Sequence, residues 1–495
     1  MSGGDWLALR NGARTALEEV PRHRFEELSE RLLEAVARGE RVSALHGWRR
    51  ADGIAEILAV LAADASGRVN VAIGEVEGSA FPSLVPACPQ LHLFERELAE
   101  TLGLEPEGHP WCKPVRFSAP EGPVIGVMDY YRVEGEEVHE VAVGPVHAGV
   151  IEPGHFRFQC HGETVLHLEI SLGYQHRGVE RALVAGDPRR RLHYAETLAG
   201  DTSVGHALAC TQALEGLAGV APSPRAETIR GIALELERLA NHTGDLGALS
   251  GDIGFLPTAS FCGRLRGDWL NLTAALCGSR FGRGLVRPGG VGFDLEPERA
   301  RRVGERVRTA LREVGEAVDL LWSTPSVMSR LEDTGALSQE DAEALGLVGP
   351  AARACGLRRD VRSDHPNGIY RFSQIARAST DSGDVFARAY LRWLEIQRSA
   401  AFVGEELDQL PEGPLRRPLP ALPPGHLCVS LVEGWRGEIC HVVRTGDEGR
   451  IAGYKVVDPS FHNWMGLALA LRGQEISDFP LCNKSFNLSY CGFDL

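Results

Sequence analysis

The chain has 495 residues, 43% hydrophobic and 24% charged, as in an ordinary globular protein with ample apolar material for a large core. At about 150 residues per domain, this length predicts two to four domains. With 67 acidic against 52 basic residues the formal net charge is −15, which argues against nucleic acid as a partner because phosphate binding requires a basic face.

The sequence also bears on location. It contains no run of about 18 apolar residues, so we expect no membrane-spanning helix. The stretch "MSGGDWLALRNGARTALEEV" lacks the apolar core of a signal peptide. The eleven cysteines are scattered without any CxxC pair, as expected of buried free thiols in a reducing compartment. We therefore expect a cytoplasmic protein.

Residues 1–117 are predicted to form a small mixed α/β domain. Helices are expected where apolar residues recur every three to four positions, and a strand where apolar and polar residues alternate. In chain order the predicted elements are a helix over 23–39, a helix over 53–65, a strand over 68–76, and a helix from 91 that ends at Gly103, followed by a turn up to 110.

Residues 118–140 contain Pro, Gly and acidic residues without strong periodicity, and we interpret them as a linker. Residues 141–495 are predicted to form a second, larger domain. Its expected elements are a β-hairpin in "HFRFQCHGETVLHLEISLG", helices over 225–255, 297–322 and 383–407, an extended Pro-rich crossover over 414–425, and a strand pair in "EICHVVRT" and "RIAGYKVVDPS".

These elements predict an α+β fold. It would combine the small mixed α/β N-terminal domain with a large, mainly α-helical domain. The large domain would have a helical-bundle core and peripheral antiparallel β-hairpins.

Several segments, in a fixed order, resemble two known families. "FERELAETLGLEPEGHP" is similar to the helix and turn of the C subunit (thirty-kilodalton type) of respiratory complex I. "VGPVHAGVIEPGHFRF", "LGYQHRGVERAL", "RAETIRGIALELERLANH", "GSRFGRGLVRPGGV" and "VEGWRGEICHVV" resemble the D subunit (49-kDa type) of complex I. They resemble more closely the large subunit of energy-converting NiFe hydrogenases of the formate hydrogenlyase type. The resemblance implies a fusion of C-like and D-like domains.

The four positions that hold metal in NiFe hydrogenases carry no cysteine here. That chemistry requires thiolates from a loop E-R-V-C-G-x-C-x-x-x-H and from a C-terminal D-P-C-x-x-C. The loop "ETLAGDTSVGH" keeps Glu196, Gly200 and His206 of the first motif. We therefore expect no NiFe centre and no metal bound by this chain. The four cysteine positions are Ala199, Thr202, Ser489 and Gly492.

In the complex I D subunit the corresponding cavity receives a quinone headgroup, bound by a His on the hairpin loop and a Tyr on the loop that replaces the first CxxC. His147 matches the first His of this hairpin loop, and His155 is a second candidate for the quinone-binding His. The Tyr position falls on Gly200, which departs from the family, and Tyr194 lies six residues earlier. The resemblance thus implies a quinone cavity lined by His147, His155, Tyr194, Thr202 and Ser489, with Glu196 and His206 as catalytic candidates.

Two further matches concern electron transfer. Arg177 and His242 match residues that lie near the terminal iron–sulfur cluster of a partner subunit in complex I, where a cation raises the cluster's potential. Arg177 could instead form a simple helix ion pair with Glu180. The expected partners are an iron–sulfur small subunit of the complex I B type, which would hold a 4Fe-4S cluster, and membrane-arm subunits of the H and antiporter types. The chain itself is expected to bind no cofactor, with quinone as a possible guest.

Three functional hypotheses follow. In the first, the chain is a peripheral-arm subunit of an ion-translocating oxidoreductase of NADH-quinone-oxidoreductase or hydrogenase type, with NAD binding expected of the complex. It would lie on the inner side of the cell membrane and shape an acceptor cavity. In the second, it is a non-catalytic coupling scaffold. An open polar cavity would favour the first, and a cavity filled by Tyr490, Phe493 and Leu495 the second. In the third, Cys210, Cys482 and Cys491 rescue an unusual hydrogenase site.

Overall fold

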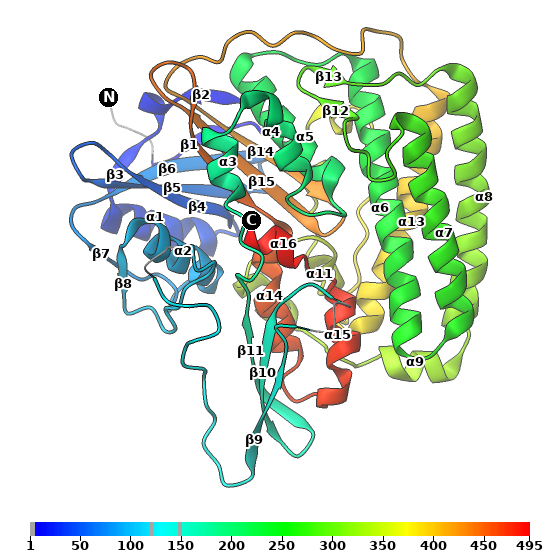
Figure 1. Ribbon diagram of the computed structural model, residues 1–495, viewed down its shortest axis with the longest axis horizontal. Helices are drawn as coiled ribbons and strands as arrows, with labels where there is room; N and C mark the ends of the chain where they lie inside the picture. Colours follow the sequence, from blue (N-terminus) through cyan, green and yellow to red (C-terminus); the bar gives the residue numbers. More distant parts are fainter. Residues whose placement is uncertain (1–4, 119–121, 147–150) are drawn as a thin grey trace.

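The computed structural model describes residues 5–118, 122–146 and 151–495. Three regions follow one another across the molecule: an N-terminal sheet, a second sheet that includes the C-terminal strands, and a group of long helices (Figure 1). A three-stranded hairpin unit extends away from them. This arrangement confirms the predicted α+β fold class, with its small mixed N-terminal part, helical core and antiparallel hairpins.

The N-terminal part is an antiparallel sheet covered by two helices, with one strand added in parallel at β6. Its elements are β1 (Leu7–Leu9), β3 (Arg22–Arg24), α1 (Phe25–Ala37), β4 (Arg41–Arg49), β5 (Ala55–Ala63), β6 (Arg68–Val76), β7 (Ala80–Pro82), α2 (His92–Leu102) and β8 (Glu105–Glu107).

The predicted helix over 53–65 is wrong, because the chain there forms strand β5. All nine residues of β5 are buried, so apolar residues occupy both faces and the alternation typical of a strand is missing. The strand over 68–76 and the helices at 23–39 and from 91 are confirmed as β6, α1 and α2. Gly103 ends α2 in the left-handed conformation with φ 64°, which glycine adopts without steric penalty.

The second sheet has the strand order β16–β15–β14–β2 and is antiparallel throughout. Its elements, with the helix that covers it, are β2 (Arg14–Ala16), α5 (Ser203–Ala218), β14 (His426–Gly434), β15 (Gly437–Thr445) and β16 (Ile451–Val457). β15 and β16 confirm the predicted strand pair. The edge strand β2 comes from the N-terminal region, so this sheet joins both ends of the chain.

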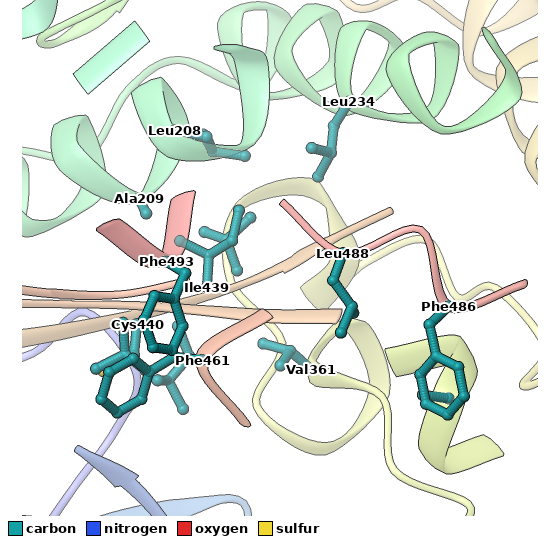
Figure 2. Packing of buried hydrophobic residues seen from close by; sticks show 14 of the residues in the cluster. Leu208, Ala209, Leu234, Val361, Ile439, Cys440, Phe461, Phe486, Leu488 and Phe493 are labelled. Atoms are coloured by element: carbon teal, nitrogen blue, oxygen red, sulfur yellow. The ribbon is translucent and has the colours of Figure 1, made fainter. Parts of the chain in front are cut away.

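This second sheet carries apolar residues on both faces. Leu208 and Ala209 of α5 lie on the same side of the sheet as Ile439, while Cys440 and Phe461 lie on the other (Figure 2). Successive residues of a strand point to opposite faces, which places Ile439 toward α5 and Cys440 away from it. Both faces therefore belong to one continuous core.

Four long helices pack side by side at the opposite end from the N-terminal sheet (Figure 1). They are α6 (Pro224–Asp252), α7 (Leu256–Cys277), α8 (Pro297–Trp322) and α13 (Val385–Asp408). These helices confirm the predictions over 225–255, 297–322 and 383–407. Among the described residues, no helix is long and apolar enough to cross a membrane.

The hairpin unit consists of β9 (Val138–Val143), β10 (His155–His161) and β11 (Thr164–Ser171) in the order β11–β10–β9. It confirms the predicted hairpin, whose turn contains Gly162 at φ 58°. The remaining elements are α3 (Val179–Ala185), α4 (Arg191–Glu196), β12 (Val286–Arg287), β13 (Gly290–Val291), α9 (Pro325–Leu331), α10 (Gln339–Ala344), α11 (Gly349–Ala354), α12 (Val361–Asp364), α14 (Pro459–Ala470), α15 (Phe479–Phe486) and α16 (Tyr490–Asp494).

Candidate functional site

The loop 196–206 joins the end of α4 to the start of α5. Glu196 is buried and its carboxylate accepts a hydrogen bond from the Gly284 amide at 2.6 Å. The carboxylate of Glu237 on α6 accepts hydrogen bonds from the Val204 and Gly205 amides at 2.7 and 3.1 Å. These are amides that a helix start leaves without intrahelical partners. The loop is therefore held at both ends: its own Glu196 accepts from Gly284, and Glu237 of α6 accepts from the amides at the start of α5.

Burial dominates the electrostatics of Glu237. It raises the pKa of this carboxyl to about 8, although the two backbone hydrogen bonds act in the opposite direction. Its neighbour Asp201 keeps a lowered pKa: burial would raise it, but the guanidinium of Arg436 outweighs burial. Near neutral pH the loop thus lies beside one protonated acid and one ion pair.

The four positions predicted to correspond to metal thiolates are all buried. Thr202 and Ser489 are 1% and 2% exposed, and Ala199 is fully buried. A Cβ added to Gly492 would lie 2.6 Å from the Oδ2 atom of Asp458, far closer than packing allows. A cysteine at 492 is therefore incompatible with the observed position of Asp458.

Asp458 ends a buried hydrogen-bond chain. Its Oδ2 lies 3.0 Å from Nε2 of His206, and His206 Nδ1 lies 3.1 Å from Nε2 of His441. The Nδ1 atom of His441 lies 2.8 Å from the hydroxyl of Tyr454. All four side chains are buried.

One set of proton positions satisfies every link of this chain. Tyr454 donates to His441, His441 donates to His206, and His206 donates to an ionised Asp458. The pKa of His441 is well below its usual value because of burial and the neighbouring His206, so a neutral ring is expected. Burial would raise the pKa of Asp458, but the hydrogen bond from His206 and the positive charge of Arg436 lower it overall. This hydrogen-bond chain can stabilise the ionised carboxylate of Asp458 and orient the protons of the two histidines and the tyrosine toward it.

Thr202 belongs to a second polar group. Its hydroxyl lies 3.2 Å from Asp201 Oδ1 and 3.1 Å from Trp435 Nε1. The Arg436 guanidinium donates to both carboxylate oxygens of Asp201, at 2.6 and 2.8 Å, and to the Asn487 carbonyl at 2.5 Å. These bonds connect the loop, the sheet and the segment before α16.

Arg177 joins the loop after α4 to the C-terminal segment, the two places where the sequence predicts the thiolate positions. Its guanidinium donates to the carbonyls of Thr197, Leu198 and Cys491 at 2.7, 3.1 and 3.1 Å. It is exposed, and among residues 5–118, 122–146 and 151–495 it forms no ion pair with a carboxylate. An exposed, unneutralised cation at this junction can act on a charged group outside the chain.

The segment just before β10 lies against the same surface. Cys491 interacts with the Glu152 side chain and with Gly200, and burial raises the pKa of its thiol to about 11. A Cβ on Gly154 would lie 2.7 Å from the Tyr490 ring, so the backbone here packs directly on α16. Gly200 is exposed, and a Cβ there would meet open space. We define the junction surface as the following residues: Glu152, Arg177, Thr197, Gly200 and Cys491.

The remaining predicted residues lie in different surroundings. His147 lies outside the described residues. His155 is half-buried at the start of β10, with Nδ1 3.3 Å from the Gly144 carbonyl and its ring 5.1 Å from that of Tyr130. Tyr194 packs against Gly186 and an apolar cluster that includes Leu183. The structure thus brings His206 and Ser489 close to Asp458, places Thr202 in the second polar group beside Asp201, and places Tyr194 in an apolar cluster.

His242 is fully buried rather than surface-exposed. Its Nε2 lies 2.8 Å from Glu395, which also receives the guanidinium of Arg353 at 2.6 Å. Burial lowers the pKa of His242 despite the carboxylate beside it. The His242 imidazole lies in the protein interior, whereas the Arg177 side chain is at the surface.

The residues present do not fit a NiFe centre. The four positions predicted to correspond to the thiolates are Thr202 and Ser489, which offer neutral hydroxyls, and Ala199 and Gly492, which offer no side-chain donor atom, whereas soft metals select thiolates. Within the part of the chain that the structure describes, no group of three or more His, Cys, Asp or Glu side chains could hold a metal ion. The alternative set of Cys210, Cys482 and Cys491 is therefore not brought together as a metal site.

The sequence analysis did not predict four residues of this site: Asp458, His441, Tyr454 and Arg436. Asp458 precedes a Pro at the start of α14, and its side chain accepts from the Ser460 amide, so its local pattern indicates only a helix cap. Its contact with His206 spans 252 positions of sequence. No local pattern reports such a contact.

Comparison with known proteins places these observations in context. The family model described as "Respiratory-chain NADH dehydrogenase, 49 Kd subunit" matches residues 252–423, and the model of the 30 Kd subunit matches residues 19–125. The carbon monoxide-induced hydrogenase of Rhodospirillum rubrum is 31% identical over 70% of this chain and 97% of its own length.

Two other relatives show similar agreement. Formate hydrogenlyase subunit 5 of Escherichia coli is 30% identical, over 83% of this chain and 76% of its own length. NADH-quinone oxidoreductase subunit 4 of Thermus thermophilus is 30% identical, over 69% of this chain and 90% of its own length. A chain of the membrane-bound sulfane sulfur reductase, an archaeal respiratory membrane complex, shares the fold with a TM-score of 0.68 at 22% identity, over 74% of this chain and 100% of that one.

Proposed function

Since the chain belongs to the family that unites the respiratory-chain NADH dehydrogenase 49 Kd subunit with the large subunits of formate hydrogenlyase and related hydrogenases, we propose that it is a redox subunit without a metal centre. It would work in a membrane-bound, ion-translocating oxidoreductase. In that complex it would dock on an iron–sulfur subunit and on membrane-arm subunits, on the inner side of the membrane. A quinone or similar acceptor would bind between the junction surface and the iron–sulfur subunit.

The observation that carries this proposal is the position of Arg177. Its guanidinium is exposed and ties the loop after α4 to the segment of α16, so a cation stands where both loops meet. A cation close to an iron–sulfur cluster stabilises the added electron and raises the cluster's potential. It would also attract the negative charge that develops on a quinone during reduction.

The reaction proposed for the site is the reduction of a quinone. Reduction of a quinone to a quinol takes two electrons, supplied by the partner's cluster, and two protons. The open space beside Gly200, where the complex I family has a Tyr, leaves room for a guest at the surface. The buried chain that ends at Asp458 would set the electrostatic potential behind the guest.

The test uses the intact complex purified from its source with Arg177→Gln in this chain. We expect reduction of a short-chain quinone to slow at least tenfold and the midpoint potential of the partner's cluster to fall, because the cation is removed. Arg189→Gln, which changes an arginine side chain that is 90% exposed, is the matched control. An unchanged potential and an unchanged rate in Arg177→Gln would overturn the proposal.

A second candidate function is a coupling scaffold without a bound acceptor. It is favoured by the burial of Tyr490, Phe493 and Leu495, which fill the space behind the junction surface. In that case the wild-type complex would fail to reduce quinones, although Arg177→Gln would still weaken assembly. Stoichiometric nickel in the purified complex would contradict both functions and support the hypothesis of a hydrogenase with unusual ligands.

A further inference from the structure

A cavity of about 350 Å³ lies between the N-terminal part and the large domain. One side is formed by α2 and the segment after it, the other by β11 and α14 (Figure 1). Its volume falls in the range of small-molecule sites. The apolar walls include Leu93, Val115, Leu168, Leu172, Trp464 and Phe493.

The polar groups of this cavity are mostly cationic. Arg96, Lys113 and Arg472 line it, whereas Glu169 is the one carboxylate among its lining residues. Glu169 is already engaged: Lys113 lies 2.5 Å from its Oε1, and the Trp111 indole and the Tyr131 amide donate to it at 3.1 and 2.7 Å. The cavity therefore holds two cations in excess of its carboxylates.

Arg96 is the central cation. Its Nε and Nη2 atoms donate to the carbonyls of Lys113 and Pro114 at 2.6 and 2.9 Å, which fixes the guanidinium plane. In the described part of the chain it has no carboxylate at ion-pair distance. Burial lowers the pKa of Arg96 to about 10, although the more distant carboxylates of Glu169 and Glu100 act in the opposite direction.

A second donor lacks a partner in the same cavity. Trp464 is 3% exposed and lines the wall, and its Nε1 makes no hydrogen bond within residues 5–118, 122–146 and 151–495. Buried indole N–H groups usually have an acceptor. The imidazole of His92 is expected to be neutral, because burial lowers its pKa to about 3. An acceptor-rich ligand would satisfy both Arg96 and Trp464.

We propose that this cavity binds an amphipathic organic anion, with an apolar body against the leucine and aromatic walls and a carboxylate or phosphate head at Arg96. A planar guanidinium recognises such heads bidentately, and the apolar walls supply the hydrophobic part of the affinity. The ligand would lie between the two domains, so that its binding favours their observed arrangement. This inference does not depend on the function proposed for the junction surface.

The test is calorimetric titration of the full-length chain with dodecanoate below its micelle concentration. We expect saturable binding to one site. Arg96→Gln should weaken this binding at least tenfold, and dodecanol, which has the tail without the charge, should bind at least tenfold more weakly than dodecanoate. Ala468→Trp, on the α14 wall, should fill the cavity and remove binding. The matched control is Arg450→Gln, at an arginine side chain that is 87% exposed.

The source of the anion is decided in a second arm with phosphatidylcholine vesicles that contain or lack phosphatidylglycerol. If the chain binds vesicles with phosphatidylglycerol and Arg96→Gln weakens that binding, the ligand is a lipid. If the chain binds dodecanoate but no vesicles, the ligand is a free acid. The proposal is overturned if neither binds, or if Arg96→Gln and Arg450→Gln bind dodecanoate equally. Thermal unfolding of each variant shows whether a loss of binding reflects a loss of fold.

Discussion

Asp458 and Gly492 form a matched pair of residues at one of the four positions predicted to correspond to a thiolate. The carboxylate occupies the volume that a side chain at 492 would need, and it is held there by His206 and by the Ser460 amide. The position of Asp458, 34 positions away in sequence, thus excludes a cysteine side chain at 492. Restoring a cysteine at 492 would require Asp458 to move as well.

This pairing predicts the effect of Gly492→Ala. The added methyl group would meet Asp458 at 2.6 Å, and overpacking of this kind costs about 1–3 kcal/mol of the free energy of unfolding. The control is Gly404→Ala in helix α13, where a Cβ meets nothing within 4 Å and should stabilise by about 0.5–1 kcal/mol. Urea unfolding of both variants provides the measurement. Equal stability of the two would show that Asp458 is free to move.

Glu237 predicts a pH dependence of stability. Its pKa in the folded chain is about 8, raised by burial from 4.5, so its contribution is fully present below pH 4.5 and is lost as the pH rises toward 8. Glu237→Gln removes this titration. Between pH 5 and 8 the stability of the wild type should therefore fall relative to the variant, by roughly 1.4 kcal/mol per pH unit.

Urea unfolding at several pH values would measure this difference. Glu412→Gln, at an exposed glutamate, should run parallel to the wild type. Parallel curves for Glu237→Gln and the wild type would mean that Glu237 is ionised in the folded protein.

At the scale of elements, the sequence predicts those whose two faces differ in environment. Helix α8 carries its buried residues on one side, and its predicted range agrees with the observed one. Strand β5 shows the limit: buried on both faces, it has no alternation, and its Ala and Leu residues favour helix in isolation. Tertiary packing outweighs local preference there.

Asn11 ties the N-terminal segment to strand β14. Its side-chain amide donates to the carbonyls of His365 and Leu431 at 2.7 and 2.8 Å, and its oxygen accepts from the Leu431 amide at 2.8 Å. Asn11→Ala leaves these groups unpaired, so we expect a loss of about 2 kcal/mol in the free energy of unfolding. Asn70→Ala, which removes one side-chain bond to Glu40, should cost about 1 kcal/mol or less. Equal losses in the two variants would contradict this role of Asn11.

At the scale of the whole molecule, charges buried far from water connect the helices to the sheet. Arg353 pairs with Glu395 of α13 and with Glu433 of β14, at 2.6 and 2.7 Å. Arg238 of α6 pairs with Glu235 at 3.0 Å and donates to the Glu433 carbonyl at 2.7 Å. Removing one member would leave a buried charge unpaired, so these contacts fix one arrangement of the elements.

The candidate site was predicted only where its residues are close in sequence. The loop 196–206 and its missing thiolates are visible as a motif, and so is the C-terminal segment with Ser489. The chain from His206 to Asp458 and Tyr454 is not, because strands far along the sequence bring these residues together. Burial of His242, too, depends on how α6 and α13 pack.

Strand β2 has a consequence for the life of the chain in the cell. Residues 14–16 pair with β14 at the border of the second sheet, and Asn11 and Gly12 extend the contact. Without them β14 would present unpaired amides and carbonyls on a long apolar strand, a template for aggregation between chains. The N-terminal segment therefore protects a strand synthesised some four hundred residues later. Because both lie on one polypeptide, the protector is always present when its strand emerges.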